Sequence, residues 1–186
     1  MIGIFEAAEE LQRFCEGEGW GSCLIGGIAV LRWGEPRVTR DVDLTLMVGF
    51  GDEGRFVEAL LKRFAGRLPD AHEFALRSLV LLLRGGNGVG IDVSLGALPF
   101  EALAVERSSY FEFEDGGKLR TCSAEDLLVM KLFAGRALDV QDAEGVVRRQ
   151  VGRLDWAHVR EQIGPLAELK DEAAIWANVE RLGRLR

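Results

Sequence analysis

The sequence has few of the residues on which cysteine and histidine chemistry depends. Its 186 residues include three cysteines without CxxC spacing and two histidines, so we expect neither a zinc site nor a disulfide framework. The cysteines are expected to be small buried side chains. No apolar run approaches the roughly 20 residues that cross a bilayer, and the first residues carry acids without a basic segment. We therefore expect no membrane span, no secretory signal and a cytoplasmic location.

A strongly basic composition is also absent. The net charge of −7 argues against a uniformly basic nucleic-acid-binding face but leaves room for a local one. Arginines that could form such a patch lie at Arg32, Arg37 and Arg40 and in the C-terminal part of the chain. Hydrophobic residues make up 48% and charged residues 28%, as in soluble globular domains. The length suits one domain, or a small catalytic half with a helical tail.

Hydrophobic periodicity predicts alternating helices and strands in the first half of the chain. Apolar residues recur at helical spacing over residues 2–17, 28–33 and 54–67. Short apolar or alternating runs predict strands over residues 22–25, 41–48, 76–84 and 89–95. The last two strands are joined by a glycine-rich segment, residues 85–88, which favours a hairpin turn.

The second half of the chain turns from strands to helices. A second hairpin is predicted from residues 108–114 and 118–122, around Asp115, Gly116 and Gly117. Ser123 is then a predicted N-cap, with acids in the first turn of the helix that it begins.

The remaining residues have helical periodicity and no strand signal. Helices are predicted over residues 142–151, 155–163 and 165–185, with Pro165 in the first turn of the last one. The order of elements predicts an α/β (α+β) fold. We expect a core over residues 1–122 and a helical C-terminal region over residues 123–186.

Three aspartates are candidate metal ligands. Asp41 and Asp43 alternate with apolar residues on one predicted strand, so their side chains point to the same side. Asp92 lies on another predicted strand, and if the two strands are neighbours, three carboxylates meet at one point. Like charges so close repel one another unless a cation lies among them, and oxygen-only ligands suit Mg²⁺. Two such ions ~4 Å apart would clamp an in-line displacement at phosphorus.

A glycine pair, Gly26-Gly27, lies just upstream of these aspartates. It precedes a predicted helix, whose N-terminus could present backbone N–H groups to a phosphate. Together, the glycine pair and the aspartates predict a site for metal and triphosphate. The chemistry expected of such a site is phosphoryl or nucleotidyl transfer.

Three segments of the chain together resemble a known superfamily. They read GGIAVLRWGEPRVTRDVDL, GIDVSLG and SAEDLLVMKLFAGRALDVQDAEGV. In order and spacing they are similar to the DNA polymerase β-type nucleotidyltransferases, and most of all to the group that includes the AbiEii-like toxins of type IV toxin–antitoxin systems. The resemblance covers residues 24–147. It implies a nucleotidyltransferase fold, in which a small mixed sheet is flanked by helices.

The resemblance also implies roles for single residues. Asp41 and Asp43 would bind two Mg²⁺ ions, and Asp92 would bind the catalytic ion near the acceptor hydroxyl. The residues assigned to the nucleotide are Gly26, Gly27, Thr39, Arg40 and Lys131. The supporting residues are Arg37, Asp139 and Asp142, the two aspartates as a helix-capping and site-orienting pair. Many relatives have Gly-Ser in place of Gly26-Gly27, so a serine hydroxyl is missing here while backbone N–H groups remain.

Simpler structural roles are open for several of these residues. Lys131 could be a snorkelling lysine on an amphipathic helix. Asp139 could merely cap the following helix, and Asp142 could merely complement its N-terminal dipole. Arg37 and Arg40 could balance the acidic cluster instead of gripping the substrate.

The function expected from the sequence is magnesium-dependent transfer of an NMP from an NTP to a hydroxyl acceptor. The acceptor could be the 3′ end of tRNA, which would suit a toxin with a cognate antitoxin as its partner. A second hypothesis is a non-catalytic binding partner that keeps the fold. A third is a small-molecule adenylyltransferase, for example one that acts on an antibiotic.

Overall fold

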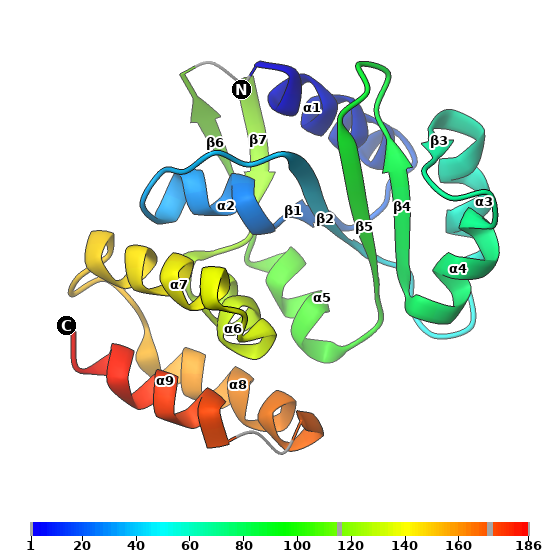
Figure 1. Cartoon of the computed structure of the whole chain (residues 1–186). Helices are drawn as coiled ribbons and strands as arrows, with labels where there is room; N and C mark the ends of the chain where they lie inside the picture. The colour runs from blue at the N-terminus through cyan, green and yellow to red at the C-terminus, as the bar shows by residue number, and fades with distance from the viewer. Residues whose placement is uncertain (1, 115–116, 171–172, 186) are drawn as a thin grey trace. The chain divides into compact units, whose positions relative to one another are not determined.

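A computed structural model describes residues 2–114, 117–170 and 173–185, and for Ile2 it describes the backbone alone (Figure 1). Contacts divide the chain into two compact units. The first consists of Met1–Ile28 and Val38–Cys122, and the second of Ala29–Arg37 and Ser123–Arg186. The segment Ala29–Arg37, which the sequence reading placed in the core, belongs to the second unit.

The first unit is built on a seven-stranded sheet among the described residues. Its strands are β1 (Ser22–Leu24), β2 (Asp41–Met47), β3 (Ala65–Gly66), β4 (Val80–Arg84), β5 (Gly90–Gly96), β6 (Ser109–Phe113) and β7 (Gly117–Thr121). Their order is β3-β4-β5-β2-β1-β7-β6. Because β2 runs parallel to β5 and β1 parallel to β7 while the other pairs are antiparallel, the sheet is mixed, as expected.

The two faces of this sheet differ in chemistry. Val42, Leu44 and Leu46 of β2 are fully buried on one face, which the helix α1 (Ile2–Gly17) covers. The opposite face carries the acids of β2, because successive side chains of a strand alternate. The helix α5 (Pro99–Glu106) packs against part of that face, where the thiol of Cys23 donates to the carbonyl oxygen of Ala104 at 3.9 Å. The aspartates therefore lie opposite the main apolar core.

One predicted helix of the first unit is too long. The helix expected over residues 54–67 is α3 (Glu53–Arg63), which ends where Phe64 adopts an extended conformation. Ala65 and Gly66 then pair with β4 as the edge strand β3. Pairing with a distant strand decided this boundary, and local periodicity does not report such pairing.

The strand expected over residues 76–84 is wrong in its first part. Residues Ala71–Ser78 form the helix α4, which buries Ala71 and Ala75 and ends at Leu79 in a left-handed conformation (φ 55°). The strand proper starts at Val80. The packing of the two alanines favours a helix up to Ser78, although the leucine-rich residues that follow have a strand-like pattern.

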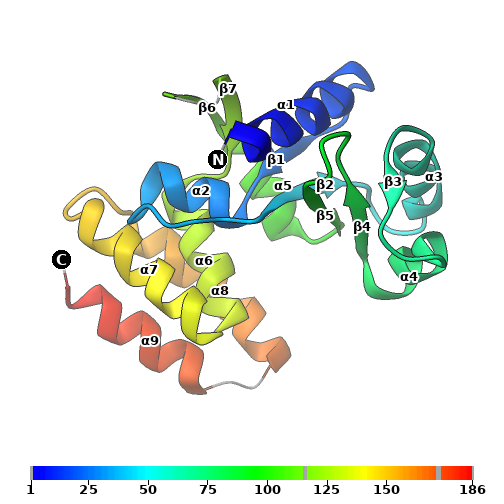
Figure 2. The ribbon, with the colours of Figure 1, turned by 45° about the horizontal axis from the view of Figure 1, so that its top comes forward.

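The second unit is helical, as expected. It contains α6 (Ala124–Ala134), α7 (Ala137–Arg149), α8 (Trp156–Lys170) and α9 (Ala173–Gly183), which pack on one another (Figure 2). The N-cap is confirmed, since Ser123 Oγ accepts the N–H of Asp126 at 3.1 Å. The helix α2 (Gly26–Trp33) begins in the first unit and ends in the second.

The position expected for Pro165 is wrong. It lies inside α8 instead of starting the last helix. A proline inside a helix removes one hydrogen bond, but the buried residues Ile163, Leu166 and Ala167 on either side of it pack well enough for the helix to continue.

Three smaller findings complete the fold. The expected hairpin of β6 and β7 is present, while Asp115 and Gly116 of its turn lie outside the described residues. Cys15, Cys23 and Cys122 are buried, as expected. Within the described ranges, no helix is long and apolar enough to cross a membrane.

Candidate functional site

The three candidate carboxylates lie on neighbouring strands. β2 and β5 are parallel, and their register places Asp43 directly opposite Asp92 and Asp41 opposite Gly90. Side chains at paired positions share one face of a sheet, with strands about 4.8 Å apart. The expectation that the two strands are neighbours is thus confirmed, and the three carboxylates come from adjoining positions on one face.

Glycines make room for these carboxylates. A Cβ at Gly90 would collide with the carboxylate of Asp41, and one at Gly26 would collide with that of Asp43. Gly26 also has a positive φ of 54°, which side chains rarely adopt. A Cβ at Gly27 would in turn collide with the side chain of Thr39. These positions therefore require glycine before any ligand is considered.

The glycine pair also forms the start of a helix, as expected. α2 begins at Gly26, and the N–H of Gly27 faces the carboxylate of Asp43 at 3.4 Å. Thr39 Oγ1 donates to the carbonyl oxygen of Asp41 at 3.3 Å, which links the segment before β2 to its first residue. Arg40, the remaining residue assigned to the nucleotide in this unit, is exposed.

An arginine that the sequence reading missed reaches the carboxylates. The guanidinium of Arg67 donates from Nη2 to Asp92 Oδ1, and its Nη1 lies 4.0 Å from Asp41 Oδ1. Arg67 was assigned to the end of a helix, whereas it directly follows β3. The sequence signal that could have placed it outside the helix is the preceding Gly66, a residue that commonly ends helices, with Pro69 shortly after it.

Asp92 is the carboxyl whose acidity the surroundings change most clearly in this region. Burial raises its pKa above the ordinary value, and the charge of Asp41 adds to the rise, while Arg67 opposes it. A carboxyl with this balance is short of positive charge even with an arginine in contact.

The donor set suits a hard divalent ion, since carboxylate oxygens are the ligands that Mg²⁺ prefers. The arrangement differs from the expectation of three carboxylates gathered at one point. Within the part of the chain that the structure describes, no group of three or more His, Cys, Asp or Glu side chains is arranged so that it could hold a metal ion. One of the three carboxylates, that of Asp92, is engaged by an ion pair with Arg67.

The second unit contains a buried ion network made of the other candidate residues. Lys131 Nζ lies 2.8 Å from Asp139 Oδ1 and 2.9 Å from Asp142 Oδ2. Arg37 makes a two-pronged pair with Asp142, at 2.6 and 2.8 Å, and Arg136 Nε donates to Asp139 at 2.5 Å. Both aspartates and Lys131 are buried. The spacing of these residues in the sequence therefore reflects one alternating chain of cations and carboxylates.

This network decides between several earlier alternatives. Lys131 is not a snorkelling lysine, because its ammonium is buried between two carboxylates. Neither aspartate caps α7, whose N-cap residue is Arg136. Arg37 pairs with Asp142 and thus balances a carboxylate other than the candidate metal ligands.

The acidity of both aspartates follows from these contacts. Burial by itself would raise the pKa of Asp139, but hydrogen bonds from Arg136 and Lys131 outweigh it and hold the pKa below the ordinary value. Burial likewise opposes the shift at Asp142, where hydrogen bonds from Arg37 and Lys131 lower the pKa. Both carboxylates are therefore ionised at neutral pH.

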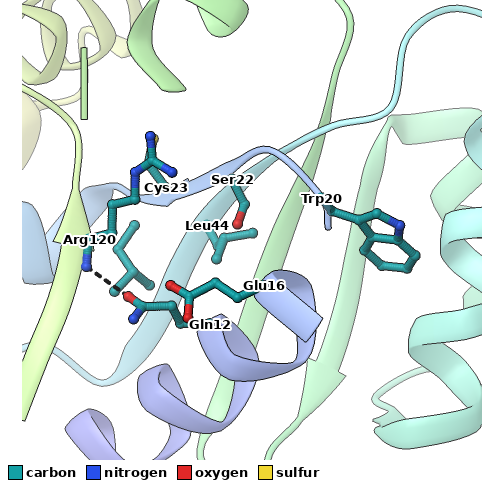
Figure 3. A pocket seen from close by; sticks show the side chains of 8 residues that line it. Gln12, Glu16, Trp20, Ser22, Cys23, Leu44 and Arg120 are labelled. Carbon is teal, nitrogen blue, oxygen red and sulfur yellow. Dashed lines mark hydrogen bonds between the residues drawn. The ribbon is translucent and has the colours of Figure 1, made fainter. Parts of the chain in front are cut away.

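A small cavity lies on the other face of the sheet from the aspartates. It is lined by Gln12 and Glu16 of α1 together with Ser22 and Leu44 of the strands, among others (Figure 3). Leu44 points into it, so the neighbouring Asp43 points away from it. With about 10 Å³ of space it could hold one water molecule. This cavity is therefore not a nucleotide pocket.

Comparison with known proteins supports the fold. No family model matches the sequence, and no curated protein matches it. Among solved structures, an antigenic nucleotidyltransferase-like protein from Paracoccidioides brasiliensis is similar over 95% of this chain and 92% of its own, with a TM-score of 0.54 and 19% identity. The chain therefore has a nucleotidyltransferase-like fold, as expected.

Two antibiotic-modifying proteins are also similar to this chain, with lower scores. ANT(2'')-Ia in complex with adenylyl-2''-tobramycin has a TM-score of 0.49 and 16% identity over 97% of each chain. The lincosamide antibiotic adenylyltransferase LnuA, bound to lincomycin, has a TM-score of 0.48 and 15% identity over 76% of this chain and 94% of its own. These likenesses concern the fold, and the AbiEii-like group stays a prediction from the sequence.

Proposed function

We propose that this protein is a magnesium-dependent nucleotidyltransferase that moves an NMP from an NTP to a hydroxyl group. The observation that carries the proposal is the pairing of Asp43 with Asp92 on neighbouring parallel strands, with Asp41 at the next position on the same face. A nucleotidyltransferase-like fold is the second support. The proposal joins the fold to a set of carboxylates that a purely structural protein would have no reason to place side by side.

Asp41, Asp43 and Asp92 are the residues that would hold Mg²⁺. Bound there, the ion would neutralise triphosphate charge and activate the acceptor hydroxyl. The chain itself supplies the rigid placement of the carboxylates, because all three lie on central strands of the sheet. The glycines opposite Asp41 and Asp43 let these side chains lie flat against the backbone, which leaves their outer oxygens toward a ligand.

The N-terminus of α2 is the part of the chain that we assign to the triphosphate. Its first N–H groups are not used within the helix, and its dipole favours an anion. The N–H of Gly27 already faces the carboxylate of Asp43, so N–H groups and metal ligands lie next to each other. Thr39 and Arg40, just before β2, stay assigned to the nucleotide as predictions from the resemblance.

Lys131 needs a different account from the one that the resemblance implies. Its ammonium is engaged by Asp139 and Asp142, so a contact with the triphosphate would have to compete with two carboxylates. We therefore assign Lys131 first to the stability of the second unit. The contact with the triphosphate stays a prediction from the sequence.

The proposal specifies the donor side of the reaction and names the acceptor only as a hydroxyl. A tRNA acceptor and an antitoxin partner remain sequence-based hypotheses with no support from the compared structures. Tobramycin, seen adenylylated in one of those structures, and lincomycin, bound in another, are further molecules to try. An acceptor screen should contain both classes.

The test is transfer of radioactivity from each α-³²P-labelled NTP, with Mg²⁺, to total tRNA, aminoglycosides, lincosamides or the protein itself. Asp43→Asn should lower the rate about 100-fold or more, as loss of a group that acts on transition-state charge does. Asp70→Asn is the matched control, since Asp70 is exposed and its side chain caps no helix. Label incorporated equally by wild type and Asp43→Asn, or by neither with any acceptor, would contradict the proposal.

A further inference from the structure

Arg67 lies in one row with two of the candidate metal ligands. Its backbone N–H donates to the carbonyl oxygen of Leu82 at 2.9 Å. Leu82 of β4 pairs with Asp92 of β5, and Asp92 pairs with Asp43 of β2. Arg67 therefore starts at the same level of the sheet as both aspartates. Its side chain can reach Asp92 by crossing a single strand.

Electrostatic attraction holds the guanidinium of Arg67 near the carboxylates, although part of the guanidinium loses its contact with water. Nε of Arg67 is buried and has no hydrogen-bond partner among the described residues. Leaving a buried donor unpaired is unfavourable, and so is fixing a long side chain. The contact with Asp92 and the 4.0 Å approach to Asp41 offset these costs. The ion pair therefore forms because the negative charges of the carboxylates attract the guanidinium.

We propose that Arg67 is the internal counter-ion of this carboxylate cluster and that a divalent cation must displace its guanidinium from Asp92 in order to bind. The inference rests on the proposed function, in which these carboxylates hold Mg²⁺. Arg67 thereby weakens metal binding in two ways. The ion pair must be broken, and the released positive charge stays close to the metal. Both effects raise the Kd for the metal.

Removal of the guanidinium should therefore tighten metal binding. Binding of Mn²⁺, which substitutes for Mg²⁺ at oxygen sites and is visible by electron paramagnetic resonance, would be measured without nucleotide. We expect Arg67→Gln to lower the Kd for Mn²⁺ about ten-fold, which matches the loss of one hydrogen bond to a charged group. Arg67→Lys keeps the charge but loses the planar fork, so its Kd for Mn²⁺ should lie between those of wild type and Arg67→Gln.

Two controls separate the contact from a general effect of charge. Arg84→Gln removes the same charge from β4, where the Arg84 guanidinium donates to the carbonyl oxygen of Gly88 at 3.3 Å. It should leave the Kd within about two-fold of wild type, because the charge is exposed and screened. In an Asp92→Asn background, Arg67→Gln should tighten binding less than it does in the wild-type background, because the pair is already gone and only the charge effect is left.

Melting temperature gives a second readout that does not depend on enzymatic activity. The same concentration of Mn²⁺, well above both Kd values, should raise the Tm of Arg67→Gln more than that of wild type, because ligand stabilisation grows with the logarithm of [L]/Kd. Unchanged or weaker binding by Arg67→Gln, an equal effect of Arg84→Gln, or an effect that is undiminished in Asp92→Asn would overturn the role of Arg67 alone. If neither wild type nor Arg67→Gln binds Mn²⁺, the metal site of the proposed function fails as well.

Discussion

In the first unit the carboxylates of Asp41, Asp43 and Asp92 share one face of the sheet and are partly exposed, whereas in the second unit Asp139 and Asp142 are buried among three cations. The first group is approached by the guanidinium of Arg67, through contacts to two of its members. In the second group each aspartate contacts two cations. Each aspartate of the second group is thus matched by two cations, while in the first group Arg67 contacts Asp92 and approaches Asp41.

This difference separates the proposed ligand site from a structural element. Buried charges that are fully paired hold helices together, and their removal leaves a partner stranded in a medium that solvates it poorly. Partly exposed carboxylates in excess over cations favour the binding of a further cation, and they stabilise the fold little when none is bound. Mutations in the two regions should therefore have opposite effects on stability and activity.

The largest effect on stability is expected for Lys131→Met. It leaves the buried carboxylates of Asp139 and Asp142 without their shared cation, and loss of one partner of a buried ion pair costs about 3–5 kcal/mol of unfolding free energy. Urea unfolding followed by circular dichroism would measure the loss. Lys62→Met, at an exposed position of α3, is the matched control. A loss below about 1 kcal/mol would mean that the network is not what holds α6 to α7.

Acid should weaken the same network. The pKa of Asp139 is lowered in the folded state, so its ionised form contributes stability above its unfolded pKa of about 3.9, and this contribution is lost as pH falls through the folded pKa. The difference in unfolding free energy between wild type and Asp139→Asn should then be constant near neutral pH and shrink below about pH 4. Urea titrations at a series of pH values would measure it. A difference that stays constant into strong acid would rule out this linkage.

The sequence was sufficient for those parts of the fold that local patterns specify. Periodicity predicts the helix α1, the buried strand β1 and the alternating strand β2. Ser123, as an N-cap, indicates where α6 begins. Long-range packing decided the rest. Burial of Ala71 and Ala75 made residues 76–78 the end of α4 instead of the start of a strand, and pairing of Ala65 and Gly66 with β4 cut α3 short.

The same distinction holds for the candidate site. Asp41, Asp43 and Asp92 could be selected from the sequence, because residue type and strand alternation are local properties. Arg67 could not, since it follows the edge strand β3, which lies three places from β2 in the sheet. The spacing of Lys131, Asp139 and Asp142 is also visible in the sequence. It led to the expectation that Lys131 contacts phosphate, whereas Lys131 pairs with the two aspartates.

The smallest effect on stability is expected for Asp41→Asn, and this variant tests the other side of the comparison. The Asp41 side chain is 51% exposed and lies 4.0 Å from the guanidinium of Arg67, so their pair is worth little in water. Without divalent ions, the unfolding free energy should stay within about 0.5 kcal/mol of wild type. With Mg²⁺ added, wild type should gain stability and Asp41→Asn should gain less, because a ligand is missing. A large loss in the absence of metal would show instead that these carboxylates hold the fold together in the way that the buried network does.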